Sequence, residues 1–153
     1  MTKEIPSVLN DALGFNIDRV AKLFRHQLTI ALAEYDLSPE QWQIMSVIWN
    51  SDGLLNQQHI SQLTFRDKHN VSRLIKRLEG KGWLEKRPNP NDSRAFFVTA
   101  TEESYAQKEA VTTALLGHFD NIGLGITETE QTHLLSLLKV IRNHLGDNEE
   151  LGI

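Results

Sequence analysis

Residues 70–87, NVSRLIKRLEGKGWLEKR, combine an apolar helical stripe with a dense group of positive charges. The apolar residues recur at positions i, i+3, i+4 and i+7, which is typical of one buried helical face: Val71, Leu74, Ile75 and Leu78. Asp67 is suited to cap this helix at its start, and Gly82 suits the left-handed position after its end. The opposite side of the helix carries the polar residues Lys68, His69, Asn70, Ser72, Arg73, Lys76 and Arg77.

A shorter helix precedes this one, and a hairpin follows it. Asn56 can cap the shorter helix, and a break is expected at residues 64–66. After Gly82 the pattern changes, because residues 83–87 and 94–99 are strand candidates joined by a turn rich in proline and asparagine. Two helices followed by an antiparallel hairpin predict a winged helix-turn-helix.

Helical segments precede this block. We expect one uninterrupted helix over residues 8–35, because apolar residues recur at helical steps and no proline interrupts them. A second helix is expected within residues 37–49, where Ser38 and Gln41 form a capping box and Pro39 fits the first helical position.

Two further helices are expected after the hairpin, one over residues 102–122 and a last one that begins after Thr127. Thr127 and Glu130 form a second capping box. The last helix has apolar residues at steps of four, three and four, which is coiled-coil-like spacing: Leu134, Leu138, Ile141 and Leu145. Two further leucines widen this face, so more than one neighbour must cover it. Residues 147–153 are expected to fray.

The charge of the chain is unevenly distributed. The 153 residues carry a formal charge of -4, but residues 66–94 hold nine Lys/Arg against four Asp/Glu. A local positive patch decides where a polyanion docks, whereas the total charge affects solubility. Charge alone leaves an ordinary solvated basic surface as an equally good interpretation. No apolar run suits a membrane span and the first residues do not resemble a secretion signal, so we expect a cytoplasmic protein.

The polar side of the basic helix is suited to DNA. A helix of this size fits the major groove, with its N-terminal side chains nearest the base edges. Arg73 suits a two-point contact with guanine and Asn70 one with adenine, while His69 and Ser72 are less specific readers. The cations further along the helix are suited to phosphates: Lys76 and Arg77. The alternative is a surface helix with ordinary charges.

The predicted hairpin adds Lys86, Arg87 and Arg94 to the positive helix. Arg94 is suited to a minor groove, where narrow A·T-rich segments have an enhanced negative potential. Asp92 would fix the Arg94 guanidinium through a bidentate pair. The alternative is a turn-stabilising aspartate beside an incidental arginine.

Four stretches of the chain resemble those of MarR-type winged-helix transcriptional regulators. LSPEQWQIMSVI (37–48) resembles the helix that opens with a Gln-Trp pair, and residues 56–87 resemble the helix-turn-helix with the first wing strand. NPNDSRAFFVTAT (89–101) resembles the Asp-x-Arg wing, and the two outer helices resemble the dimerisation elements. Together the four stretches cover nearly the whole chain in the family's order.

The resemblance implies a mainly α (α+β) fold, a winged helix-turn-helix with long N- and C-terminal dimerisation helices. The dimerisation helices would cover residues 1–36 and 102–146, the DNA-binding lobe residues 37–101, and a frayed tail residues 147–153. The last helix would form its dimer seam through the four coiled-coil-like positions. The implied activity is that of a homodimer that binds a pseudo-palindromic operator in double-stranded DNA, usually as a ligand-responsive repressor.

The resemblance also implies which residues touch DNA. It transfers base and phosphate contact to residues 68–77 and to Arg94, with Asp92 in a supporting role. Amides at the start of the shorter helix, near Gln57 and Gln58, would approach the DNA backbone.

A small-molecule effector is a further expectation from the resemblance. Many members of the family are released by small aromatic or phenolic anions bound between the dimer helices and the winged lobe. Four residues could line such a pocket, although a core or surface role explains each more simply: Arg25, His26, Trp42 and His118. The chain has no cysteine, which excludes regulation by thiol oxidation.

Two other classes of function compete with this interpretation. An enzyme is not expected, because the six histidines form no H-E-x-x-H motif and the chain has no G-x-S-x-G, P-loop or G-x-G-x-x-G motif. For the same reason we expect no cofactor and no metal. A winged-helix module that binds protein partners without specific DNA binding is the second alternative.

Overall fold

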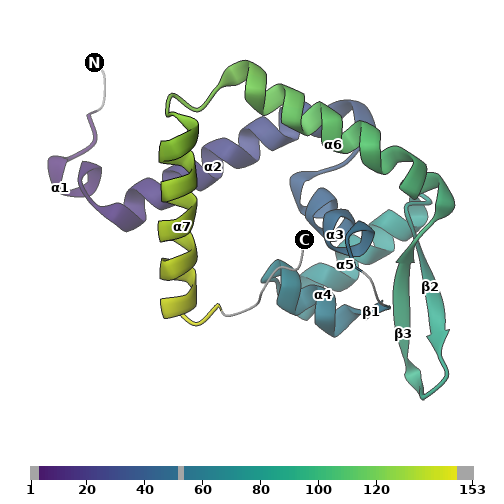
Figure 1. Cartoon of the computed structure of the whole chain (residues 1–153). Coiled ribbons are helices and arrows are strands. Elements are labelled where there is room, and N and C mark those ends of the chain that lie inside the picture. The colour runs from purple at the N-terminus through teal and green to yellow at the C-terminus, as the bar shows by residue number, and fades with distance from the viewer. Residues whose placement is uncertain (1–3, 52–53, 148–153) are drawn as a thin grey trace.

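The structure is a computed structural model that describes residues 4–51 and 54–147 (Figure 1). Its elements, in chain order, are α1 (Ser7–Asn10), α2 (Leu13–Leu32), the 3₁₀ turn η1 (Ala33–Tyr35), α3 (Pro39–Trp49), β1 (Leu55–Asn56), α4 (Gln57–Thr64), α5 (Lys68–Gly80), β2 (Leu84–Asn89), β3 (Asp92–Ala100), α6 (Glu102–Ile122) and α7 (Glu128–His144). Helices joined to one small antiparallel sheet confirm the predicted mainly α winged helix-turn-helix fold. No helix among the described residues combines the length and the apolar character of a membrane span.

The core of the winged lobe lies where α3, α4 and α5 meet the sheet. All four residues of the stripe that the sequence predicted on α5 are buried. Ile44 and Met45 on α3, Ile60 on α4 and Val98 on β3 are also buried, so every element of the lobe contributes to one core. Burial of each such side chain stabilises the lobe by roughly 1.5–3 kcal/mol. Because the apolar side of α5 is anchored in this core, the polar side of the helix faces solvent.

The sheet has three strands in the order β1-β3-β2, with antiparallel pairing throughout. β1 was not predicted from the sequence, because it has only two residues, with Leu55 opposite Val98. The hairpin is also longer than expected. β2 reaches Asn89 and β3 begins at Asp92, so the turn is confined to residues 90–91. The long strands carry the wing tip away from the helices (Figure 1).

The predicted single helix over residues 8–35 is wrong at both ends. Ala12 has an extended backbone (ψ 124°), which separates α1 from α2. Asn16 stabilises this break, because its side-chain amide donates to the carbonyls of Asn10 (2.7 Å) and Ala12 (2.9 Å). At the other end α2 tightens into η1, which ends at Asp36 in a left-handed conformation (φ 52°).

The predicted capping boxes are confirmed. The Ser38 hydroxyl accepts from the Gln41 amide (3.2 Å), and the Gln41 side chain accepts from the Ser38 amide (3.0 Å). Thr127 and Glu130 exchange the same two bonds at the start of α7. At the end of α5, Gly82 has φ +77° and the amide of Trp83 donates to the carbonyl of Leu78 (3.0 Å). These bonds satisfy backbone groups that helix ends otherwise leave unpaired.

The outer helices leave apolar surface uncovered. Phe24 on α2 stacks on Phe119 on α6 (ring centroids 5.4 Å apart), and α7 lies at the end of the molecule away from the wing (Figure 1). Large apolar side chains are exposed along α7: Leu134, Leu135, Leu137 and Val140, with Leu145 just past its end. Within the predicted seam, Leu138 and Ile141 are half-buried in the chain itself. The expected frayed tail lies outside the described residues, except for Asp147.

Candidate nucleic-acid interface

The side of α5 that faces away from the core is positively charged. Six of the seven predicted polar residues are exposed: Lys68, His69, Ser72, Arg73, Lys76 and Arg77. On a helical wheel His69, Arg73 and Lys76 lie opposite the buried stripe, so they project furthest from the lobe. A helix of about 10–12 Å diameter with such a face fits the major groove.

Asp67 fixes the start of this helix, as predicted. Its carboxylate accepts from the Asn70 amide at 2.8 Å. The pKa of Asp67 is held below its usual value, first by this bond from Asn70 and then by the backbone amide and charge of His69. The carboxylate is therefore ionised at neutral pH and favourably placed against the positive end of the helix dipole.

The seventh polar residue, Asn70, is placed differently from the rest. Asn70 is half-buried, and its side-chain oxygen is covered by protein without a hydrogen-bond partner among the described residues. A two-point contact with adenine needs both the oxygen and the nitrogen of the amide. Asn70 must therefore rotate its side chain before it can read a base in the predicted way.

The turn between α4 and α5, where a break was predicted at residues 64–66, contains two residues whose conformation and contacts the sequence did not indicate. Phe65 adopts a left-handed backbone (φ 53°) and is 84% exposed. A non-glycine residue in this conformation costs on the order of 1–3 kcal/mol, so the turn is strained. Arg66 follows it and donates from Nη2 to the side-chain oxygen of Gln43 on α3 (2.6 Å). The left-handed position was not detectable because glycine, its usual signal, is absent.

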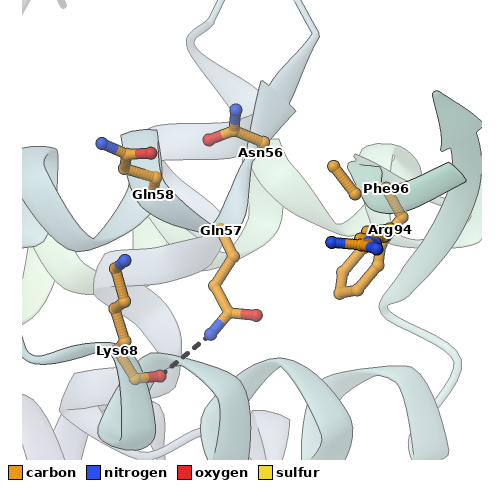
Figure 2. A pocket seen from close by; sticks show the side chains of 7 residues that line it. Asn56, Gln57, Gln58, Lys68, Arg94 and Phe96 are labelled. Atoms are coloured by element: carbon orange, nitrogen blue, oxygen red, sulfur yellow. Dashed lines mark hydrogen bonds between the residues drawn. The ribbon is translucent and has the colours of Figure 1, made fainter. Parts of the chain in front are cut away.

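An open pocket of about 230 Å³ lies between the start of α4 and the wing. Figure 2 shows Lys68 and Gln58 on one side, Arg94 and Phe96 on the other, and Gln57 between them. The Gln57 side chain donates to the backbone carbonyl of Lys68 (3.0 Å), which ties the start of α4 to the start of α5. The structure thus brings the predicted backbone-contact residues and the predicted wing arginine to one surface.

The predicted pair between Asp92 and the Arg94 guanidinium is absent from the described residues. Asp92, the first residue of β3, instead accepts from the backbone amide of Arg94 at 2.9 Å, a bond that aspartate side chains commonly make with the amide two residues on. Arg94 is exposed near the tip of the wing and lines the open pocket. Asp92 therefore binds the backbone of Arg94, and no ion pair in the described part of the chain joins it to the Arg94 guanidinium.

Ion pairs distinguish the cations of β2 from a second group of cations on α5 and the wing tip. Lys86 pairs with Glu79 (3.8 Å) and lies over the Phe96 ring (4.5 Å), and Arg87 pairs with Glu85 (2.9 Å). The second group has no ion pair with any described residue: Lys68, Arg73, Lys76, Arg77 and Arg94. The group without ion pairs lies on α5 and the wing tip, which is the surface that the sequence assigned to DNA.

The residues considered for an effector pocket each have another position or contact. Arg25 binds Glu40, His118 shares a hydrogen bond with Gln27 (2.8 Å), and Trp42 packs partly against the core. His26 is exposed on α2. None of these four side chains lines the open pocket beside the wing.

Comparisons with known proteins find similar sequences and folds among transcriptional regulators. A family model described as the MarR family matches residues 35–95. The transcriptional regulator PecS of Dickeya dadantii (strain 3937) is 27% identical over 135 residues, which cover 86% of this chain and 81% of PecS. A mutant of MarR from E. coli, solved in complex with operator DNA, superposes with a TM-score of 0.77 and 25% identity, over 84% of this chain and 92% of that one.

The repressor CouR superposes more completely at lower identity. CouR bound to a 23-mer DNA duplex gives a TM-score of 0.83 with 20% identity, over 92% of this chain and 99% of CouR. CouR from Rhodococcus jostii RHA1 has also been solved bound to p-coumaroyl-CoA, with a TM-score of 0.76 and 20% identity over 89% of this chain and 95% of that one. At this identity the likeness to CouR establishes the fold.

Proposed function

Because this chain belongs to the MarR family of winged-helix transcriptional regulators, we propose that it is a cytoplasmic homodimer that represses transcription from a pseudo-palindromic operator in double-stranded DNA. The observation that carries this proposal is the group of five cations on α5 and the wing that have no ion pair within the described chain. Cations that are free of internal partners can neutralise phosphates without first breaking an ion pair. The solved complexes of MarR and CouR with DNA support the same use of the fold.

Each lobe would engage one half of the operator. Arg73 would make a two-point contact with guanine, and Lys76 and Arg77 would bind phosphates. His69 and Ser72 would read further base edges. The amides near Gln57 and Gln58 would approach the backbone where the open pocket lies, and Arg94 would enter the adjacent minor groove.

The second copy would cover the outer helices. The exposed apolar residues of α7 are left about half uncovered by the described part of this chain, and a homodimer would bury them. Such a dimer would set the two α5 helices about 34–36 Å apart, which is one turn of DNA. A seam of this kind would include Leu134, Leu138 and Ile141, together with Leu145.

We further propose release from DNA by a small aromatic or phenolic effector. An effector that changes the spacing of the two lobes would weaken binding, because both recognition helices must engage the same duplex together. Support for this part is at the level of the family: the neighbour CouR has been solved with p-coumaroyl-CoA.

The proposal is tested by selecting fragments of the source genome on the purified protein, followed by footprinting. We expect a protected, two-fold-related site and a clear shift of that fragment at moderate ionic strength. Arg94→Ala should weaken binding by on the order of 1–3 kcal/mol, whereas Lys139→Ala, which removes an exposed cation from α7, should not. A protein that selects no fragment but captures a protein partner through the wing would instead support a protein-interaction module.

A further inference from the structure

Helix α3 carries two polar side chains, one turn apart, that hold arginines from two different parts of the chain. Glu40 accepts from Arg25 of α2, with its Oε1 atom 2.7 Å from Nε and 2.5 Å from Nη2. Gln43 accepts from Nη2 of Arg66 at 2.6 Å. Residues three apart lie on the same side of a helix. The two bonds, Arg25 to Glu40 and Arg66 to Gln43, therefore lie on one side of α3 and form a polar junction between α2 and the turn before α5.

Arg66 is the critical end of this junction, because it stands between the strained Phe65 and the helix cap Asp67. The Arg66 amide donates to the Ser61 carbonyl of α4 (3.0 Å). Its Nε atom is buried and has no hydrogen-bond partner among the described residues. The guanidinium thus lies against the lobe, where Gln43 of α3 accepts its hydrogen bond. Because Arg66 directly precedes Asp67, a shift of Arg66 would be expected to displace the residue that caps α5.

The charge of Glu40 acts on both arginines. Burial raises its pKa, but a hydrogen bond from its own backbone amide, the bond and charge of Arg25, and the charge of Arg66 together hold the pKa below its usual value. Glu40 is therefore a carboxylate at neutral pH. It attracts the α2 arginine directly and the arginine of the turn at longer range.

We propose that Glu40 is a positioning residue for DNA binding, which fixes the start of α5 relative to the dimerisation helix α2 through Arg25 and Arg66. The inference rests on the proposed function, since it assumes that α5 is the recognition helix. Helix α3 makes no predicted contact with DNA, so Glu40 would influence the affinity for DNA only through the position of α5.

Whether removal of the Glu40 charge weakens or strengthens DNA binding distinguishes a positioning role from simple repulsion between Glu40 and DNA. Removing an acidic side chain from a DNA-binding protein normally strengthens its attraction to a polyanion. If Glu40 positions α5, Glu40→Gln should instead weaken binding, because the amide keeps the shape of the side chain and loses its charge. Glu109→Gln is the matched control, since Glu109 is an exposed acid on α6.

The first measurement uses the free protein and needs no DNA. Hydrogen exchange should become faster in Glu40→Gln at the amides of Arg66 and Asn70, and remain unchanged in the core of α5 and in Glu109→Gln. Equal exchange rates at these two amides in Glu40→Gln and wild type would overturn the proposal.

The second measurement uses a duplex selected from a random library by the wild-type protein, with a scrambled duplex for comparison. Glu40→Gln should bind the selected duplex about fivefold more weakly, whereas Glu109→Gln should bind equally or more tightly. Equal or tighter binding by Glu40→Gln would also overturn the proposal. If the wild-type protein selects no duplex, the proposed function fails, and faster exchange at Arg66 still supports the positioning of the turn.

A charge swap separates the two arms of the junction. The double variant Arg25→Glu with Glu40→Arg restores an ion pair between α2 and α3 but places a cation near Arg66. We expect it to recover thermal stability without recovering affinity for the selected duplex. Full recovery of affinity would show that Glu40 acts only as a structural ion pair, and would refute the role assigned to Arg66.

Discussion

Replacement of Lys76 by alanine offers a quantitative test of how this protein engages DNA. Lys76 is exposed on α5, opposite the buried stripe, and it has no ion pair with any described residue. Each phosphate contact changes the slope of log Kobs against log salt by about 0.9. A homodimer carries two copies of Lys76, so the slope should become shallower by about 1.8. The loss of affinity relative to wild type should then change about twelvefold between about 50 and 200 mM salt.

The assay is a salt titration of binding to a selected duplex, by fluorescence anisotropy, for wild type and Lys76→Ala. Scrambled duplex should show the same change in slope, because a phosphate contact carries no sequence information. Lys139→Ala is the control, since Lys139 is an exposed cation on α7, away from the wing (Figure 1). A change of about 0.9 would mean that one lobe binds at a time. An unchanged slope would remove Lys76 from the phosphate contacts and refute the assigned orientation of α5.

Three further predictions concern assembly and stability. Leu134→Asp should give monomers or aggregates in light scattering, because the new charge would be buried in the proposed seam. Ser136→Asp is the control and should remain dimeric, since Ser136 lies on the opposite face of α7. Thr127→Ala should lower the free energy of unfolding in urea by about 1 kcal/mol, and Thr113→Ala within α6 should not, since Thr113 caps no helix. The lowered pKa of Asp67 means that its contribution to stability is present above the unfolded value near 3.8 and is lost as the pH falls through the folded value. Asp67→Asn keeps a capping oxygen, so urea titrations below about pH 4 should show a smaller loss of stability than in wild type.

The sequence predicted those features whose physical cause is local. The capping boxes at Ser38 and Thr127 depend on residues three apart, and the stripe on α5 depends on the helical period, so both could be read from the chain. The break after α1 depends on the Asn16 side chain reaching back to two carbonyls, which no composition rule signals. Strand β1 forms because Leu55 and Asn56 pair with the edge of β3, more than 40 residues later in the chain. Pairing between such distant residues cannot be predicted from the local sequence.

The sequence predicted which residues belong to the candidate site, but it did not predict the hydrogen bonds between them. Charge and spacing indicated which side of α5 is positive, and the structure exposes six of the seven residues named there. The roles of Asp92 and Asn70 depend on which donors and acceptors lie nearest in the folded chain. Asp92 binds the backbone amide of Arg94 instead of its guanidinium, and the side-chain oxygen of Asn70 is covered instead of free to contact a base. The junction at Glu40 joins residues far apart in the sequence, so only the folded chain reveals it.

The contacts of Lys86 have a consequence for how DNA shape is sensed. Lys86 on β2 pairs with Glu79 on α5 and lies over the Phe96 ring on β3, so one side chain links both strands of the hairpin to α5. If α5 lies in one groove of DNA and Arg94 enters the adjacent groove, as proposed, this link would limit changes in the distance between them. Duplexes whose neighbouring grooves match that distance would then be bound without distortion, whereas other duplexes would first have to bend or narrow a groove. Base pairs that the protein never touches would then contribute to the choice of site.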